Sequence, residues 1–313
     1  MDDTIKLRVI NMTKLYNNGD GVKNVDLDVH TGELVTLLGP SGCGKTTILR
    51  TIGGFIDLTD GDITIDGKSI ITLPPEKRPT SMVFQSYNLW PHMTVHDNLE
   101  FGLKLRKIPK DIREQKITEG LSLVKMSGGQ QQRIAIARSL LLEPEVLLLD
   151  EPFSALDAKI RMEMREELRK IQTDLNITVI FVTHDQEEAM MLSDRIVVMS
   201  KGHIEQQGTP REVYDNPVSR FVAGFIGEMN FLDDGSGRQV AVRPEHISVV
   251  KGTGGDLTGT VRTVMMLGHY LEMTLDTDKG LVKVYINSDQ ADEFAKGDVV
   301  SLKFARTYSY AKE

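Results

Sequence analysis

Residues 33–52, ELVTLLGPSGCGKTTILRTI, decide the fold of this chain. The segment from Glu33 to Leu38 is short and apolar, as expected of a buried strand, and Thr46 to Ile52 has helical character. Between them, Gly39 to Thr46 satisfies the eight-residue phosphate-loop pattern, in which glycines let backbone N–H groups surround phosphates. Lys45 would reach the terminal phosphates and Thr46 would hold Mg²⁺. A glycine-rich turn without a ligand is the alternative, but the strand before it and the helix after it favour phosphate binding.

A pair of acids follows the apolar strand expected from Val146 to Leu149. Asp150 and Glu151 would therefore lie at the carboxyl end of a strand, where α/β sheets bind ligands. Asp150 suits Mg²⁺ coordination, and Glu151 suits a general base that polarises the attacking water. Alone, such a pair is more often a strand end with solvated acids, so its interpretation as a site depends on the phosphate loop.

A second anion site is predicted where a helix begins with Ser127, Gly128, Gly129 and Gln130. A serine and two glycines leave bare N–H donors at the positive end of a helix. One ATP does not need two such sites from one chain, so a second copy could present this turn to the first copy's nucleotide in a head-to-tail dimer. By itself the segment could equally be a simple N-cap.

The chain predicts an α/β fold in two domains. Short strands before residue 36 predict an antiparallel β edge, residues about 87–142 a helical lobe, and the repeated alternation of strand and helix a parallel sheet. A linker-like run, Asp233 to Gly237, separates this part from short alternating segments that predict a small all-β, OB-like barrel. We therefore expect a nucleotide-binding domain over 1–232 and a β-barrel domain over 233–313.

Composition limits the possible partners and compartment. The 37 basic and 45 acidic residues give a net charge of -8, which offers no broad attraction to nucleic acid. The single cysteine, Cys43, cannot form an intrachain disulfide or a cysteine-based zinc site, which fits a reducing compartment. The first residues lack the pattern of an export signal, and no apolar run is long enough to cross a membrane.

These motifs together resemble the ordered motif set of the ABC ATPase family, over about residues 5–231. The matching segments are Gly39–Thr46, Gln85 after a strand, Ser127–Gln130, Asp150 with Glu151, Ser154–Asp157, and His184. The resemblance implies a P-loop NTPase core that hydrolyses ATP with Mg²⁺.

The resemblance also implies individual roles. Glu151, His184, Lys45 and Gln85 are expected to be catalytic, with His184 contacting the γ-phosphate. Thr46, Gln85 and Asp150 are expected at Mg²⁺, and Asp157 in the loop that crosses the dimer. Tyr16 resembles the aromatic residue that stacks on adenine, although it could simply pack at a strand edge. The expected ATP-binding residues are Tyr16, Gly39, Pro40, Ser41, Gly42, Cys43, Gly44, Lys45, Thr46 and Thr47.

The C-terminal part resembles the TOBE-like β-barrel of importer ATPases of the maltose, polyamine and ferric-ion group. Ala241 to Glu245 and the strands that follow carry this likeness, and Phe221 to Phe231 matches the usual junction. Sugar transporters of the group often carry a Ser-Pro-Pro insert that is absent here, which favours polyamine, phosphonate or ferric-type cargo. The implied partners are a second copy or a paralogous ATPase, two permease subunits, and indirectly an extracytoplasmic solute-binding protein. The implied location is the cytoplasmic face of the cell membrane.

The chain departs from the family between Val124 and Ser127, where only Lys125 and Met126 connect the helical lobe to the signature turn. The linker from Leu232 to Val240 is also shorter than usual. These departures bear on coupling to the permease rather than on the ATP site.

Two other classes of function compete with transport. A soluble ABC protein of DNA repair or translation would carry long coiled coils, tandem nucleotide domains or basic arms, which this sequence lacks. A regulatory protein whose barrel senses a solute could be distinguished by ligand titration of residues 240–313. The charge-rich run from Lys159 to Lys170 is expected to be the solvated face of a helix.

Overall fold

The computed structural model describes residues 4–123, 130–252, 254–268 and 270–312. Backbone contacts divide the chain into two compact units, Met1–Asn216 and Pro217–Glu313. This division precedes the linker-like run, so helix α8 (Arg220–Phe225) and strand β11 (Asn230–Asp233) belong to the second unit by contacts. The domain boundaries expected from the sequence, 1–232 for the nucleotide-binding domain and 233–313 for the β-barrel domain, stay a prediction.

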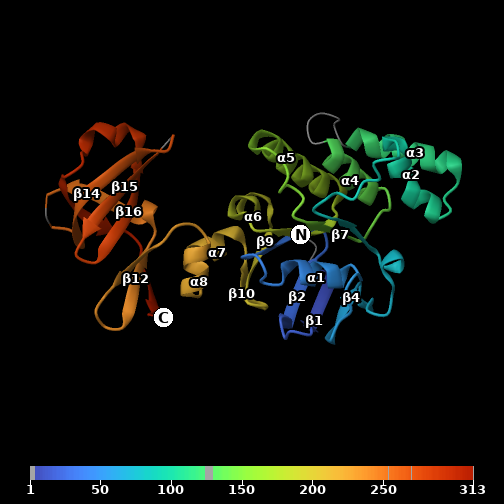
Figure 1. The fold of residues 1–313 in the computed structure, drawn as a ribbon, viewed down its shortest axis with the longest axis horizontal. Coiled ribbons are helices and arrows are strands. Elements are labelled where there is room, and N and C mark those ends of the chain that lie inside the picture. Colours follow the sequence, from blue (N-terminus) through green and yellow to red (C-terminus); the bar gives the residue numbers. More distant parts are fainter. Residues whose placement is uncertain (1–3, 124–129, 253, 269, 313) are drawn as a thin grey trace. The chain divides into compact units, whose positions relative to one another are not determined.

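The first unit is built on a central sheet of order β10-β9-β3-β8-β7-β6 (Figure 1). Its strands are β3 (Leu34–Leu38), β6 (Thr80–Val83), β7 (Val146–Asp150), β8 (Thr178–Thr183), β9 (Arg195–Ser200) and β10 (His203–Gly208). Neighbours from β9 to β6 pair in parallel, and β10 adds an antiparallel edge to β9. Every residue of β3, β7 and β8 is buried, because helices and a second sheet cover both faces. The predicted parallel sheet is confirmed, and its carboxyl edge gathers the ends of β3, β7 and β8.

A second, antiparallel sheet has the order β2-β1-β4-β5, as the predicted β edge required. Its strands are β1 (Ile5–Leu15), β2 (Gly21–His30), β4 (Asp60–Ile65) and β5 (Lys68–Ser69). Helix α1 (Lys45–Ile52) lies between the two sheets, because its apolar face shares one buried core with residues of both. That packing fixes the helix whose first turn ends the phosphate loop.

The opposite face of the central sheet carries the helical lobe and two further helices. The lobe contains α2 (Val95–Leu105), α3 (Lys110–Leu123) and α4 (Gln130–Leu140), and a break at Pro109 separates the first two, as expected of proline. A capping box at Thr94 begins α2. Helices α5 (Ala158–Leu175) and α6 (Gln186–Leu192) follow β7 and β8, and α7 (Pro210–Asp215) follows β10. A second buried core joins α2, α4 and α5 to the sheet.

The second unit consists of antiparallel strands, together with helix α8 and short 3₁₀ turns. Strands β11, β12 (Arg238–Val242) and β18 (Tyr308–Ala311) form one small sheet. The other sheet has the order β13-β17-β14-β15-β16, with strands β13 (Ile247–Lys251), β14 (Leu257–Met266), β15 (Tyr270–Thr277), β16 (Gly280–Asn287) and β17 (Val299–Phe304). Its edge strands β13 and β16 approach each other around a buried apolar core, which agrees with the predicted OB-like barrel. Among the described residues, no helix is long and apolar enough to cross a membrane.

Candidate functional site

The phosphate loop runs from the end of β3 into the first turn of α1. Gly42 and Gly44 have φ values of 80° and 106°, a region that side chains rarely adopt. A Cβ atom on Gly44 would also lie 2.3 Å from Cγ1 of Val22, so only glycine lets β2 approach the loop this closely. The local sequence therefore produces the curved backbone on which phosphate binding depends.

Lys45 is held inside its own loop. Its Nζ atom donates to the carbonyl oxygens of Gly39 at 2.7 Å and Pro40 at 3.0 Å, and the residue is only 5% exposed. A cavity of about 260 Å³ opens beside the loop, lined by Tyr16, Asp20, Gly21, Ser41, Gly42, Gly44, Lys45, Thr46, Thr47 and Glu151. Backbone N–H groups, a lysine and an aromatic ring thus line a single cavity, as nucleotide binding requires.

Tyr16 stands at the edge of this cavity. Its hydroxyl group is 3.3 Å from Oγ1 of Thr47, and its ring is largely exposed. The residue is 43% exposed, and Nζ of Lys14 lies 5.7 Å from the centre of its ring. The role of Tyr16 in stacking on a base stays a prediction.

Asp150 reaches the loop from the end of β7. Its Oδ1 atom accepts a hydrogen bond of 3.1 Å from the Thr46 hydroxyl group. Burial raises the pKa of the Asp150 carboxyl group, and the bond from Thr46 and the charge of Arg50 oppose that shift. A hydroxyl oxygen beside a carboxylate oxygen is a donor set that suits Mg²⁺, so this pair fits the predicted metal. Gln85, the third predicted ligand, donates instead to Glu151 and Ser154.

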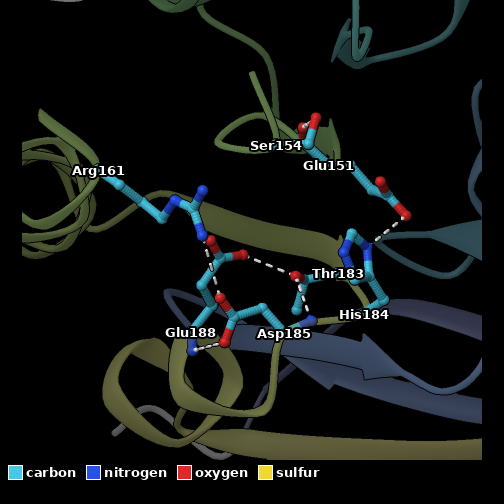
Figure 2. A pocket seen from close by; sticks show the side chains of 7 residues that line it. All are labelled: Glu151, Ser154, Arg161, Thr183, His184, Asp185 and Glu188. Atoms are coloured by element: carbon cyan, nitrogen blue, oxygen red, sulfur yellow. Dashed lines mark hydrogen bonds and ion pairs between the residues drawn. The ribbon is translucent and has the colours of Figure 1, made fainter. Parts of the chain in front are cut away.

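Glu151 lies at the centre of the predicted catalytic residues. Its φ of 46° turns the chain sharply after β7, and its N–H group donates to the carbonyl oxygen of Val182 at 3.0 Å. Its carboxylate oxygens lie 3.2 Å from Nδ1 of His184 and 3.2 Å from Nε2 of Gln85. Figure 2 shows the imidazole ring of His184 turned toward Glu151. Residues far apart in the sequence are therefore brought together at the edge of the nucleotide cavity.

The loop that carries Gln85 is fixed by a residue that the sequence analysis missed. The side chain of Tyr87 is buried and donates from its hydroxyl group to the carbonyl oxygen of Pro152 at 3.1 Å. Arg138 of α4 donates to the carbonyl oxygens of Tyr87 and Asn88. No motif in the sequence indicates Tyr87, because its role depends on a loop contact rather than on spacing.

The predicted dimer-facing residues are described only in part. Asp157 is exposed and caps the N-terminus of α5, where its side chain accepts from the N–H group of Ile160 at 3.0 Å. Ser127, Gly128 and Gly129 lie outside the described residues, and Gln130 is the first residue of α4.

The charge-rich run on α5 differs from its prediction. Arg165 is 4% exposed and pairs with Glu188 of α6, so part of this run faces the protein interior rather than solvent. Arg161 and Arg165 both contact Asp185 beside His184. The four-residue spacing of Arg161 and Arg165 was the sequence signal for this shared contact, since it places both on one face of the helix.

The chain matches two family models. Residues 22–154 match the model described as ABC transporter, and residues 240–307 match the model described as TOBE domain. It is 44% identical to the spermidine/putrescine import ATP-binding protein PotA of Borrelia garinii subsp. bavariensis, over 89% of this chain and 91% of that protein. It is also 44% identical to the protein of the same name from Mesorhizobium japonicum, over 96% and 95% of the two chains.

Two solved structures resemble the first unit. One is cbiO1 from Clostridium perfringens, part of the ABC transporter complex cbiONQ, with a TM-score of 0.62 and 29% identity over 68% of this chain and 92% of that one. The other is a dimeric ATP-binding cassette in a post-hydrolysis state with ADP and phosphate, with a TM-score of 0.57 and 32% identity over 66% and 99% of the two chains.

Proposed function

Because this chain belongs to the ABC transporter family, we propose that it is the ATP-hydrolysing subunit of an importer for spermidine, putrescine or a related polyamine. The observation that carries the proposal is that Lys45, Thr46 and Glu151 line one cavity, where Thr46 donates a hydrogen bond to Asp150. The cargo assignment rests on the relatives, several of which are named for spermidine and putrescine import.

The site residues perform complementary steps. Lys45 exchanges its loop carbonyl partners for the terminal phosphate oxygens of ATP. The Glu151 carboxylate takes a proton from the attacking water while the water oxygen forms a bond to the γ-phosphorus. The bond between the γ-phosphorus and the β–γ bridging oxygen breaks at the same time. His184, which lies 3.2 Å from Glu151, donates toward the γ-phosphate. Thr46 and Asp150, with Gln85, would hold Mg²⁺, which would offset the charge that develops on the phosphate oxygens.

The proposed working form is a head-to-tail dimer of two such chains, or of this chain with a paralogous ATPase. In it, the turn from Ser127 to Gln130 of one copy faces the nucleotide of the other, and Asp157 lies in the loop that crosses between them. The solved ATP-binding cassette with ADP and phosphate is a dimer, which supports a dimeric working form. Two permease subunits would bind the dimer at the cytoplasmic face of the membrane, with a solute-binding protein acting outside.

The Glu151→Gln variant tests the dimer and the catalytic base together. Because the amide keeps the shape of the side chain but cannot accept a proton, ATP should still bind while turnover falls by about 10²–10⁴-fold. Light scattering with and without ATP should show an ATP-dependent dimer that persists in the variant. Glu205→Gln removes the same charge from exposed strand β10 and should change neither property.

Either of two results would contradict the proposal. Unchanged turnover in Glu151→Gln would remove this residue from its role, and a chain that binds ATP but remains monomeric would contradict the shared site. The cargo is tested separately by uptake of labelled spermidine into cells that carry the chain or its Glu151→Gln variant. Equal uptake by the two would exclude polyamine transport.

A further inference from the structure

We propose that Arg165 and Glu188 are positioning residues for His184, an inference that rests on the proposed ATPase function. His184 has an exposed ring, with 58% of its side chain accessible, and it contacts Glu151 at 3.2 Å. A surface ion pair of this kind holds a side chain only weakly. The orientation of the ring must therefore come mainly from the backbone on either side of it.

Both chain neighbours of His184 are fixed by buried groups, as Figure 2 shows. On one side, the Thr183 hydroxyl group donates to Glu188 at 2.6 Å and accepts from the N–H group of Asp185 at 3.0 Å. On the other side, Asp185 caps α6 by accepting from the N–H groups of Glu187 and Glu188. The turn that carries His184 is thus closed by hydrogen bonds before and after it.

Arg165 joins these two sides from a different helix. Its Nη2 atom donates to Asp185 at 3.0 Å and to Glu188 at 3.0 Å. Arg165 and Glu188 are each 4% exposed. Removing one partner of a buried pair leaves the other charge without compensation, so this pair strongly favours one arrangement of the turn. Both bonds leave the same nitrogen, so this double contact depends on the position and charge of Nη2 rather than on the fork of the guanidinium group.

The face of α5 that carries Arg165 also carries Asp157, the residue predicted to lie at the dimer contact. Asp157 caps the helix, and Arg161 and Arg165 follow at spacings of four residues, so the three lie on one face. Arg161 donates to the carbonyl oxygen of Leu156 at 3.0 Å and lies 3.5 Å from Asp185. Arg161, Glu188 and Glu151 all line one small cavity of about 50 Å³.

The alternative is that the pair only stabilises the fold, and the chain offers a matched control for it. Arg169, one turn further along α5, donates to Asp194 at 2.7 Å and 3.1 Å. The side chains of Arg169 and Asp194 are 39% and 11% exposed, so this pair shares the helix and the chemistry of the first but is less buried. Asp194 accepts from the N–H group of Leu34 at the start of β3, the end of that strand opposite the phosphate loop. Loss of this pair should reduce stability without altering His184.

A double-mutant cycle on the steady-state ATPase activity of the full chain tests the proposal. We expect Arg165→Met to lower kcat by about 10²-fold, as a misplaced catalytic group does, with the KM for ATP changed less than threefold. In a His184→Ala background, Arg165→Met should lower kcat no further, because both changes remove the same interaction. Arg169→Met should leave kcat within about twofold of the unmodified chain in either background.

Two further variants separate positioning from stability. Arg165→Met with Glu188→Met removes both charges, so we expect thermal stability to return toward that of the unmodified chain while kcat stays low. Arg165→Lys keeps the charge and should recover part of kcat, and it replaces Arg165→Met in the cycle if that variant does not fold. Two results would overturn the proposal. One is that Arg165→Met lowers kcat in the His184→Ala background by the same factor as in the unmodified chain. The other is that kcat recovers along with thermal stability when Arg165→Met and Glu188→Met are combined. An unmodified chain without ATPase activity would instead contradict the proposed function itself.

Discussion

Replacing Arg78 with methionine should destabilise the first unit far more than replacing an arginine on its surface. Arg78 is 6% exposed and donates to the carbonyl oxygens of Thr51 at 2.7 Å and Ile52 at 2.8 Å, which end helix α1. It also donates to the carbonyl oxygens of Leu73 at 2.9 Å and Ile71 at 3.3 Å. The side chain therefore closes the last turn of the helix whose first turn carries the phosphate loop.

The expected loss follows from these bonds. A hydrogen bond from a charged donor contributes about 1.5–3 kcal/mol, and a buried carbonyl oxygen left without a partner costs a similar amount. Methionine fills much of the volume of the arginine side chain, and water can replace the bonds to Leu73 and Ile71. The lost stability therefore comes mainly from the two bonds at the end of α1. Two such bonds sum to about 3–6 kcal/mol, and the methionine contacts offset part of this sum, so the free energy of unfolding should fall by about 3–4 kcal/mol.

Urea unfolding followed by tryptophan fluorescence measures this loss in the relevant unit. Trp90 is the single tryptophan of the sequence and lies in the first unit, so its signal reports on that unit. With an m-value of about 2–3 kcal/mol per molar, the midpoint should fall by roughly 1–2 M. Arg8→Met is the matched control, because Arg8 pairs with Asp28 on the surface and should shift the midpoint by less than about 0.5 M. Equal shifts in the two variants would refute the reasoning.

Three further predictions concern the nucleotide cavity. Gly44→Ala should weaken ATP binding at least about tenfold in a fluorescent-nucleotide titration, because its Cβ atom would meet Val22 and its φ is 106°; unchanged affinity would contradict the loop geometry. Tyr16→Ala should weaken ATP binding by about 5–150-fold, whereas Tyr16→Phe, which loses only the hydroxyl contact to Thr47, should not; equal effects would exclude stacking. Burial raises the pKa of Asp150, so the protonated form appears at a higher pH than for an ordinary aspartate. Apparent Mg²⁺ affinity should therefore decline as pH falls toward that raised pKa, and Asp150→Asn should flatten this dependence.

Much of the fold could be predicted because its signals are local. The phosphate loop combines glycines, a lysine and a threonine within eight residues, between a strand and a helix, and the structure places it there. The apolar run from Val146 to Leu149 predicted a buried strand, which is β7, and residues about 87–142 predicted a helical lobe, which contains α2, α3 and α4. Only the contact boundary between the units, after Asn216, lies away from the composition change near residue 233.

The candidate site was predictable where a residue type at fixed spacing carries the chemistry. Lys45, Asp150 and Glu151 belong to this group, since each follows directly from a strand end or a loop pattern. Tyr87 and Glu188 do not, because a tyrosine after a strand or a glutamate in a helix has many equivalents in any sequence. The expectation that the charge-rich run on α5 faces solvent failed at Arg165, because the sequence does not show that Glu188 lies within its reach.

The sequence by itself determined the order of the elements, the backbone of the phosphate loop and the chemical types at the site, because these depend on residues close together along the chain. Only the tertiary structure decided which distant groups meet. Arg165 reaches Glu188 and Arg78 reaches Thr51 because packed helices and strands bring them within hydrogen-bonding distance. A buried charge has to find its partner in space, and separation along the sequence does not reveal that partner.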